Sequence, residues 1–334
     1  MTDPATLRSR RFDPGVHREW LAVGESWLGP TPLPLVVVQG HVPGPRVVVI
    51  AAQHGDEGYA VLATHRLAEE LDPSVLSGSV WLLPCLNVHG YVHGKRVSPF
   101  DHHDMNRVHP GARDGTVTEQ LAAALIEDVL PGADLLIDLH GGSPENGDIA
   151  FARWSDVAGK PSLEPIVRAL DVRFVVAPGS RDVPGMLSGA TTAIGVPQIA
   201  IEACNAYGRS TDNATEMAGF VTTALRALDM LPGPAPEQRN HEARSTATHR
   251  AHTGGIWESF VTFGQHVRTG DALGVVRNLL GERVQEVPST ATGIVAVMRT
   301  GTRVHPGETL CTLAVDPAAV DSAATDPTAV GASA

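Results

Sequence analysis

The chain has 334 residues, of which 43% are hydrophobic, and this is enough material for about two domains with separate cores. Its formal net charge is -12, and Lys95 and Lys160 are its only lysines, so nucleic acids and anionic membranes are poor candidate partners. The sequence has no apolar run near the length of a membrane span, no secretory signal pattern at its N-terminus, and three widely spaced cysteines without a CxxC motif. We therefore expect a cytoplasmic protein with reduced thiols.

Up to about residue 230, short apolar runs rich in valine and isoleucine alternate with amphipathic segments. The runs predict strands near residues 34–39, 46–52, 79–83, 134–139, 173–176 and 197–201. The amphipathic segments predict helices near residues 57–71, 117–130, 161–170 and 213–230. We therefore expect an N-terminal extension over residues 1–33 and then an α/β catalytic domain over residues 34–230, with a parallel or mixed sheet flanked by helices.

The second predicted strand is followed by an imidazole and a carboxylate at ligand spacing. His54 and Glu57 belong to the motif His-Gly-Asp-Glu, which lies directly after the apolar run 47–52 and before a predicted helix. Side chains at a strand end and at the start of the next helix can converge on one small cation. The motif is therefore half of a candidate zinc site.

A third ligand is expected because hydrolytic zinc sites use three protein ligands and leave the fourth position to water. His140 ends the apolar run 134–139 and precedes two glycines, so it fits this role. If both strands lie in one parallel sheet, their carboxyl ends share an edge. Asp138 points to the same side of its strand as His140 and can orient a histidine ligand. Asp56 is then interpreted as a turn or supporting residue instead of a ligand.

A hydrolytic zinc site also needs a base for its water. Glu202 follows the apolar run 197–201, where a carboxylate without a partner would be costly. It can accept a proton from the attacking water and pass that proton to the departing amine. The alternative is a strand-end residue that caps a helix or pairs with an arginine.

The segment between the strand ends carries further motifs. It contains Gly-Lys-Arg at 94–96, Ser-Pro-x-Asp at 98–101 and Asp-x-Asn-Arg at 104–107. Together with His-Gly-Asp-Glu and Asp-Leu-His, these motifs resemble the succinylglutamate desuccinylase/aspartoacylase family, a group of zinc deacylases related to the zinc carboxypeptidases. Their order and spacing are most similar to the branch of N-acetyl-diaminobutyrate deacetylases, and the resemblance covers about residues 35–315.

The resemblance implies a role for each matching position. These positions are the ligands of one Zn²⁺ per chain, His54, Glu57 and His140, the carbonyl-polarising Arg96, the carboxylate-binding pair Asn106 and Arg107, and the catalytic Glu202. The arginine roles agree with side-chain chemistry, because a planar guanidinium grips a carboxylate with two hydrogen bonds. A solvated loop with surface arginines is the alternative. Relative to the aspartoacylase pattern, residues are inserted between Arg96 and Asn106, which bears on the geometry of carboxylate binding.

Several other polar residues near these motifs have no assigned role. The histidines of the loop offer no further carboxylate at ligand spacing, so we interpret them as loop residues near the substrate entrance; they are His89, His93, His102, His103 and His109. Tyr207 and Arg209 follow Glu202 closely enough to approach substrate.

The C-terminal part of the sequence differs in composition. A linker is expected over residues 231–248, a β-rich accessory domain over 249–316 and a disordered tail over 317–334. Within the β-rich part, the pattern GxxVxxG occurs at 264–270 and again at 301–307, and it resembles the biotinyl/lipoyl-like barrel-sandwich hybrid. A carrier function is excluded by chemistry, because such domains attach their cofactor to lysine and none follows Lys160.

Together these observations predict a zinc-dependent hydrolase that removes an acyl group from a small-molecule N-acyl amino acid or a similar amide with a free carboxylate. A zinc carboxypeptidase acting on short peptides would use the same site. A lyase or transferase acting on acyl groups and a non-catalytic zinc-binding protein stay open as well. The family resemblance also makes a homodimer or homotetramer plausible, while the sequence does not determine which acyl group and which amino acid form the substrate.

Overall fold

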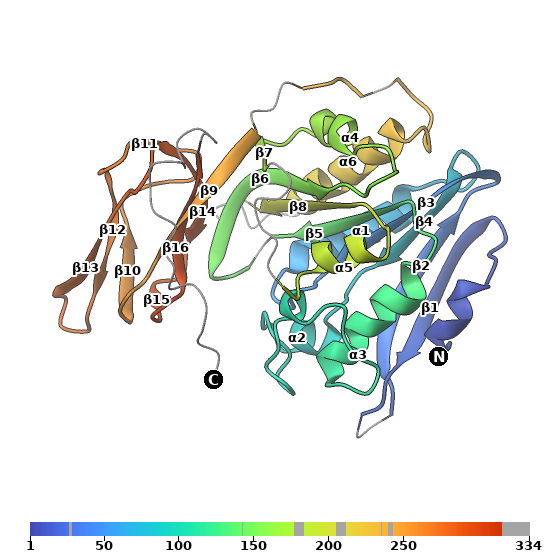
Figure 1. Ribbon diagram of the computed structural model, residues 1–334, viewed down its shortest axis with the longest axis horizontal. Coiled ribbons are helices and arrows are strands. Elements are labelled where there is room, and N and C mark those ends of the chain that lie inside the picture. The colour runs from blue at the N-terminus through green and yellow to red at the C-terminus, as the bar shows by residue number, and fades with distance from the viewer. Residues whose placement is uncertain are drawn as a thin grey trace. The chain divides into compact units, whose positions relative to one another are not determined.

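The computed structural model describes residues 1–26, 29–141, 143–176, 184–204, 212–234, 236–239 and 243–315. The chain divides into two compact units, Met1–Glu242 and Ala243–Ala334 (Figure 1). The tail expected to be disordered, residues 317–334, lies outside the described residues. Among the residues that are described, no helix is long and apolar enough to cross a membrane.

The first unit is built on one mixed sheet. Its strands are β1 (Gly15–Val23), β2 (Thr31–Gln39), β3 (Val42–Ala51), β4 (Ser77–Leu83), β5 (Leu135–His140), β6 (Asn146–Ser155), β7 (Phe174–Val176) and β8 (Gln198–Cys204). They lie in the order β1-β2-β4-β3-β5-β8-β6-β7. The central strands β4, β3, β5 and β8 run parallel to one another. Their carboxyl ends therefore share one edge of the sheet, where open α/β folds bind ligands.

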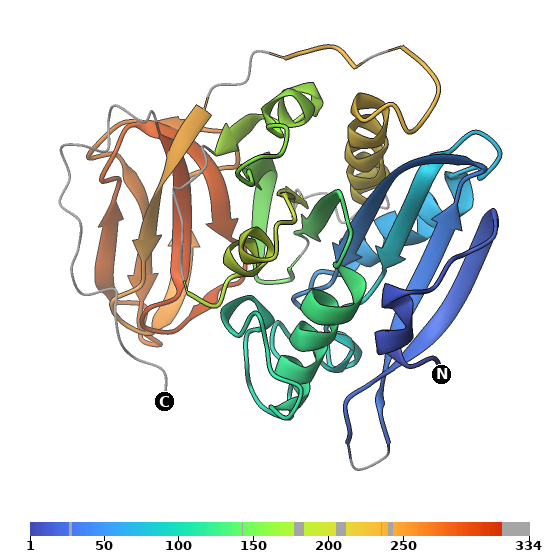
Figure 2. The ribbon, with the colours of Figure 1, turned by 45° about the vertical axis from the view of Figure 1, so that its right-hand side comes forward.

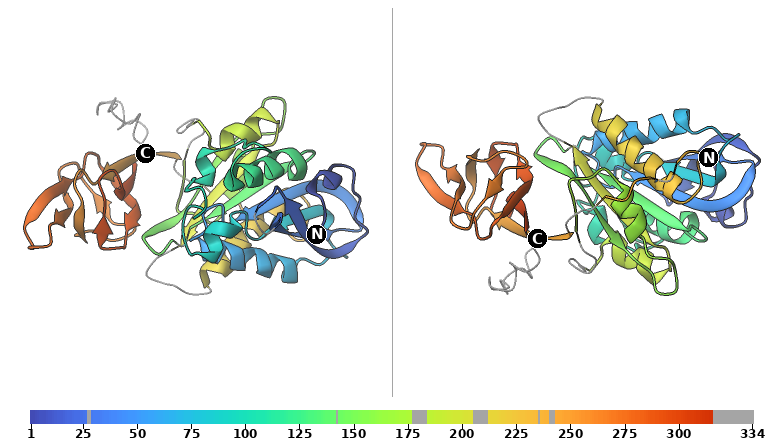
Figure 3. Two further views of the ribbon diagram at one scale, coloured as in Figure 1. Left: turned by 90° about the horizontal axis from the view of Figure 1, so that it is seen from below. Right: turned by 90° about the horizontal axis from the view of Figure 1, so that it is seen from above.

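Helices cover both faces of this sheet (Figure 3). They are α1 (Gly58–Glu70), α2 (Val88–Val92), α3 (Val117–Ala124), α4 (Glu164–Ala169), α5 (Leu187–Ala193) and α6 (Asp212–Ala227). Short 3-10 turns precede β1, at Pro4–Arg8, and follow α2, at Met105–Arg107, and a π-helical turn, Leu125–Val129, extends α3. Helix α1 packs against α6, which also contacts α4. On the other face, α3 and α5 pack over an apolar core that also includes residues of β1, β2 and β3.

The predicted N-terminal extension is part of the first unit. Strand β1 pairs with β2 along its whole length, and Figure 2 shows this hairpin at the edge of the sheet. Leu7 and Leu21 are 1% and 0% exposed and belong to the same core as Val48 and Ile50 of β3. This strand could not be recognised in the sequence, because residues such as Arg18 face solvent at the sheet edge and interrupt the apolar pattern.

In the described part of the first unit, the other predicted strands and helices agree with the structure to within a few residues. The elements not predicted there are β1, β6, α2, α5 and the two 3-10 turns. Strand β6 runs antiparallel to β8 and alternates buried positions with half-buried Ala150 and Arg153. Helices α2 and α5 are 5 and 7 residues long, too short to show a helical period in the sequence.

The second unit consists entirely of β-strands and turns in its described part. Its strands are β9 (Ala243–Arg250), β10 (Gly255–Ser259), β11 (His266–Val267), β12 (Ala272–Arg277), β13 (Arg283–Pro288), β14 (Gly293–Arg299), β15 (Arg303–Val304) and β16 (Thr309–Val315). Within it, one sheet has the order β9-β16-β14-β11 and the other β13-β12-β10-β15. Trp257, Leu273, Val295 and Leu313 are among the buried residues of its core.

The β-rich unit begins earlier than the sequence indicates. Residues 243–248 were expected to belong to the linker, but they form most of β9, which pairs antiparallel with β16. The segment Ala-Arg-Ser-Thr-Ala-Thr is polar and therefore reads as a loop. Its threonines nevertheless suit a strand whose partner supplies the apolar side chains, because β-branched residues fit a pleated surface.

Candidate metal centre

The first part of the site lies where β3 gives way to α1. Ala52 follows the strand with a φ of 48°, and this left-handed residue turns the chain away from the sheet. His54 and Glu57 come next, each 4% exposed, and Glu57 precedes the first residue of α1. Their side chains face each other, with His54 Nδ1 2.7 Å from Glu57 Oε1.

His140 brings the third candidate ligand from the end of β5. Its Nδ1 atom lies 3.0 Å from the second carboxylate oxygen of Glu57, Oε2. The possible ligand atoms of His54, Glu57 and His140 all lie within 4.8 Å of one another, and all three residues are buried. Two imidazole nitrogens and one carboxylate are the donor set of a catalytic zinc site with an open fourth position. The donor set therefore fits the cation that the sequence predicts.

Each histidine of the set has a second carboxylate on its other ring nitrogen. His140 Nε2 lies 2.8 Å from Asp138 Oδ2, as expected for an orienting residue. His54 Nε2 lies 3.3 Å from Asp104 Oδ1, at ion-pair distance but without the alignment of a hydrogen bond. A carboxylate bonded to Nε2, as Asp138 is to His140, fixes which ring nitrogen keeps its proton and leaves Nδ1 of His140 to bind a metal. Sequence reasoning assigned no role to Asp104, although it opens the Asp-x-Asn-Arg motif.

The histidines and carboxylates of the site shift one another's pKa values. Burial alone would raise the pKa of Glu57, but His54 and His140 outweigh it and hold this pKa well below its usual range. Burial alone would lower the pKa of His140, but the nearby carboxylates, first Asp138 and then Glu57, hold it well above its usual range. The surrounding carboxylates thus favour positive charge at this place. A bound cation would supply the same charge.

Arg96 lies beside the metal-binding set. Its carbonyl oxygen accepts a hydrogen bond from the backbone N–H of Gly55, with an N–O distance of 3.2 Å. Its guanidinium donates to Asp104 Oδ2 over 3.1 and 3.2 Å, and Nη1 lies 3.9 Å from Glu57 Oε1. The side chain is 47% exposed, so it can reach a ligand in solvent while remaining next to the ligand set.

Glu202 lies on β8 directly beside His140, its register partner on β5. Neighbouring residues of parallel strands point to the same face, so both side chains belong to one site. Glu202 contributes to the raised pKa of His140. Its Oε1 accepts a hydrogen bond of 2.9 Å from Arg153 Nη2 on β6. Sequence reasoning missed Arg153, although pairing with an arginine was the alternative expected for Glu202.

Asn106 and Arg107 follow Asp104 on the same loop. Asn106 is 5% exposed, and its Oδ1 accepts a hydrogen bond of 2.9 Å from the backbone N–H of Leu187, the first residue of α5. Arg107 is exposed and donates from Nη1 to the carbonyl oxygen of Asn106 over 2.6 Å. The amide oxygen of Asn106 thus binds the start of α5, whereas the guanidinium of Arg107 lies at the surface.

Gly55 is required by a close approach of two backbones. A methyl group at this position would overlap the backbone of Gly90 in α2.

We therefore expect Gly55→Ala to lower the free energy of unfolding by about 1–3 kcal/mol and to weaken metal binding, because the loop between His54 and Glu57 must shift. Denaturant unfolding and metal analysis measure both effects. At the matched position Gly58 the nearest atom is 3.9 Å away, on Tyr91, so Gly58→Ala is expected to be neutral. Equal stability of the two variants would contradict this account.

The other histidines of the loop do not form a second cluster. Among the described residues, the His54, Glu57 and His140 group is the one with metal-binding geometry. His89 and His103 contact the hydroxyls of Thr31 and Thr116. His109 lies in the interior, 5% exposed, and contacts Gln53 instead of the substrate entrance where it was expected. Tyr207 and Arg209 lie outside the described residues.

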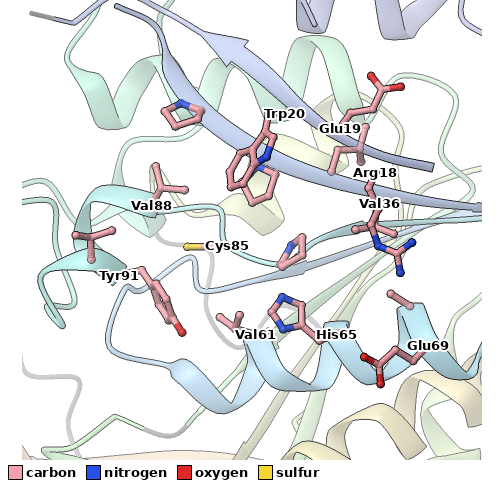
Figure 4. A pocket seen from close by; sticks show the side chains of 16 residues that line it. Arg18, Glu19, Trp20, Val36, Val61, His65, Glu69, Cys85, Val88 and Tyr91 are labelled. Carbon is pink, nitrogen blue, oxygen red and sulfur yellow. The ribbon is translucent and has the colours of Figure 1, made fainter. Parts of the chain in front are cut away.

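A separate cavity of about 590 Å³ lies between the β1–β2 hairpin and helices α1 and α2 (Figure 4). Its walls are mostly apolar and include Trp20, Val61, Val88 and Tyr91. The thiol of Cys85 also lines it, and burial raises the pKa of this thiol to about 12. A thiol with such a pKa is protonated at neutral pH and is not a nucleophile.

Comparison with known families agrees with the motifs. The model of the succinylglutamate desuccinylase/aspartoacylase catalytic domain matches residues 43–228. A curated N-alpha-acetyl-L-2,4-diaminobutyric acid deacetylase from Halomonas elongata is 34% identical over 128 residues, which are 38% of this chain. That alignment spans 37% of the length of the relative. The family resemblance that the sequence indicated is thereby confirmed.

Solved structures share the fold over almost the whole chain. The product-bound ectoine utilization protein EutE (DoeB) from Ruegeria pomeroyi has a TM-score of 0.80 and 24% identity, covering 92% of this chain and 98% of that one. A succinylglutamate desuccinylase/aspartoacylase from Rhodobacter sphaeroides has a TM-score of 0.78 and 24% identity, with the same coverage. These structures confirm the expected α/β fold with a mixed sheet and flanking helices.

Proposed function

Because the chain belongs to the succinylglutamate desuccinylase/aspartoacylase family, we propose that it is a zinc-dependent hydrolase of N-acylated amino acids or similar small amides with a free carboxylate. The observation that carries this proposal is the convergence of His54, Glu57 and His140 within 4.8 Å at strand ends. Glu202 lies beside this group in register with His140, where a catalytic base is needed.

The reaction assigns one task to each group of the site. Zn²⁺ held by His54, Glu57 and His140 would act as a Lewis acid that lowers the pKa of a water to about 7. Glu202 takes a proton from the attacking water and returns it to the amine nitrogen as the C–N bond breaks. The products are the free amino acid and the carboxylate of the acyl group, so one water is consumed for each amide cleaved.

Arg96 is proposed to donate hydrogen bonds to the carbonyl oxygen as negative charge develops on it. The contact of its guanidinium with Asp104 supports this role, because it holds the arginine next to Glu57. We expect Arg96→Lys to lower kcat by about 10²- to 10³-fold with zinc content unchanged, since an ammonium cannot reproduce the planar fork. Steady-state kinetics and metal analysis test this.

Lys95 provides the control for that variant. It precedes Arg96 on the same loop and is exposed, so Lys95→Met removes a positive charge without touching the ligand set. We expect its kcat to stay within a few-fold of the parent. Equal kcat losses in both variants would mean that any substitution in this loop lowers activity, and that the guanidinium of Arg96 has no specific role.

Asn106 and Arg107 are proposed to bind the substrate carboxylate. The exposed guanidinium of Arg107 supports this, because it lies on the same short turn as Asp104, which contacts Arg96. Of the possible substrates, N-acetyl-2,4-diaminobutyrate is the first to assay, because the curated relative bears the name of its deacetylase. Other N-acetyl and N-succinyl amino acids complete the panel.

The assay that tests the proposal compares N-acyl amino acids with dipeptides on zinc-loaded protein, using release of a primary amine as the signal. We expect turnover of at least one N-acyl amino acid and a lower kcat/KM for every dipeptide. Faster cleavage of dipeptides would favour a zinc carboxypeptidase instead. Stoichiometric zinc without hydrolysis of any compound would favour a non-catalytic zinc-binding protein.

The second unit is proposed to be an accessory domain of the biotinyl/lipoyl-like type. Its two sheets and the repeated GxxVxxG turns support this, while the exposed tip of the hairpin between β12 and β13 carries Leu279 and Leu280 where a carrier would need lysine. Catalysis is proposed to reside in the first unit. A cytoplasmic location and a homodimeric or homotetrameric state stay predictions.

A further inference from the structure

A chain of buried polar side chains leads from His140 into the interior of the first unit. Asp138 Oδ2 lies 2.8 Å from His140 Nε2. The same oxygen accepts hydrogen bonds from the side-chain amides of Gln53, over 3.0 Å, and Gln198, over 3.3 Å. All of these side chains are at most 4% exposed. Donors from several elements thus converge on one carboxylate oxygen behind a proposed metal ligand.

Each glutamine is held in turn by a partner of its own. Gln53 Oε1 lies 3.1 Å from His109 Nε2, and Gln198 Oε1 accepts a hydrogen bond of 3.0 Å from the hydroxyl of Thr191. These partners matter because an amide group has nearly the same shape when it is turned over. The Asp138 carboxylate can only accept, and the hydrogen bond to the amide oxygen reinforces the orientation in which the N–H group faces it.

His109 is held in one protonation state by this arrangement. The amide oxygen of Gln53 has no proton, so Nε2 of His109 must donate the hydrogen bond. Burial lowers the pKa of His109 to about 4, so the ring is neutral at pH 7. Its Nδ1 atom is buried and has no hydrogen-bond partner among the described residues. A buried polar atom without a partner lowers the free energy of unfolding. A histidine that only filled space here would therefore be less favourable than an apolar side chain.

We propose that His109 is a positioning residue for the metal centre. It orients the amide of Gln53, Gln53 holds Asp138, and Asp138 fixes the ring of His140 with Nδ1 directed at the cation. The inference rests on the proposed function, because it requires His140 to be a metal ligand. Groups that hydrogen-bond directly to metal-binding histidines, as Asp138 does to His140, typically change metal affinity by about 10- to 100-fold when they are lost. His109 acts two residues further away, so we expect an effect at the lower end of that range.

Competition with a chromophoric chelator for Zn²⁺ tests the inference in the full-length protein. We expect His109→Phe to weaken zinc affinity about 10-fold, because phenylalanine fills the space but cannot donate to Gln53. We expect His109→Gln to stay within about 3-fold of the parent, since its terminal amide N–H can take the place of Nε2. Gln53→Leu is expected to lose about as much as His109→Phe.

The double variant separates positioning from general damage to the core. If His109 acts through Gln53, adding His109→Phe to Gln53→Leu causes no further loss of zinc affinity. The matched control is His249→Phe, which replaces a buried histidine of the second unit and is expected to leave zinc affinity unchanged. Circular dichroism and thermal unfolding establish that each variant is folded.

Three results would overturn the inference: equal zinc affinity losses in His109→Phe and His109→Gln, unchanged affinity in Gln53→Leu, or additive losses in the double variant. Unchanged zinc affinity in Gln53→Leu would overturn the inference even if His109→Phe does not fold. A parent protein that binds no zinc would instead contradict the proposed function itself, so the two failures are distinguishable.

Discussion

Replacing Glu202 by glutamine is expected to reduce kcat by about 10³- to 10⁴-fold while zinc content stays at the parental level. Glutamine has nearly the shape of glutamate and can still accept a hydrogen bond from Arg153, so the strand end should keep its structure. It cannot accept a proton at neutral pH, however, and the water is left without a base. The loss should therefore appear in kcat and much less in KM, because the substrate is held by other residues.

Steady-state kinetics and metal analysis on the same preparations measure this prediction. Glu70→Gln, an exposed change near the end of α1, is the control and is expected to behave like the parent. Activity of Glu202→Gln within about 10-fold of the parent would remove Glu202 from the mechanism. Loss of zinc in this variant would instead make Glu202 part of the metal-binding set.

Removing either histidine ligand is expected to abolish stoichiometric zinc and with it the hydrolytic activity. His54→Ala and His140→Ala each leave the cation with two protein ligands, fewer than catalytic zinc sites use. His140→Ala should be the more damaging, because the buried Asp138 carboxylate then keeps only the neutral amides of Gln53 and Gln198 as partners. In His54→Ala, the Asp104 carboxylate still pairs with Arg96. Breaking a buried ion pair from one side costs about 3–5 kcal/mol, so we expect His140→Ala to unfold at a lower denaturant concentration than His54→Ala.

Elemental analysis of protein purified without chelator measures the zinc content of these variants. His65→Ala, on the exposed side of α1, is the control for loss of a histidine and is expected to keep full zinc. Stoichiometric zinc in either ligand variant would show that the cation is held elsewhere. Full zinc together with lost activity would reassign the histidine from binding the metal to binding the substrate.

The strand ends of the site could be predicted because each is a local pattern. An apolar run that stops at His140 or at Glu202 is visible in the sequence, and parallel pairing then brings such ends together. The roles of Arg96, Asn106 and Arg107 were predicted from the resemblance of their motifs to the family. The proximity of His54 and Glu57 also follows from local sequence, because both residues lie at the junction of β3 and α1.

Asp138 was predicted as a supporting residue from its place two residues before His140, but the other supporting residues could not be predicted because their contacts depend on the register of distant elements. Arg153 reaches Glu202 only because β6 runs antiparallel to β8, and β6 itself gives a weak pattern. Gln53 meets Asp138 across 85 positions of sequence. His109 looked like one of several loop histidines, and nothing in its local sequence distinguishes a buried one from an exposed one.

The measurement that tests the central claim most directly is a zinc titration of chelator-treated protein, followed by hydrolysis of an N-acyl amino acid. We expect the metal-free protein to be inactive and activity to rise in proportion to added Zn²⁺ until each chain holds one ion. The His140→Ala variant should show no such rise. Full activity in protein shown by elemental analysis to contain no zinc would contradict the account.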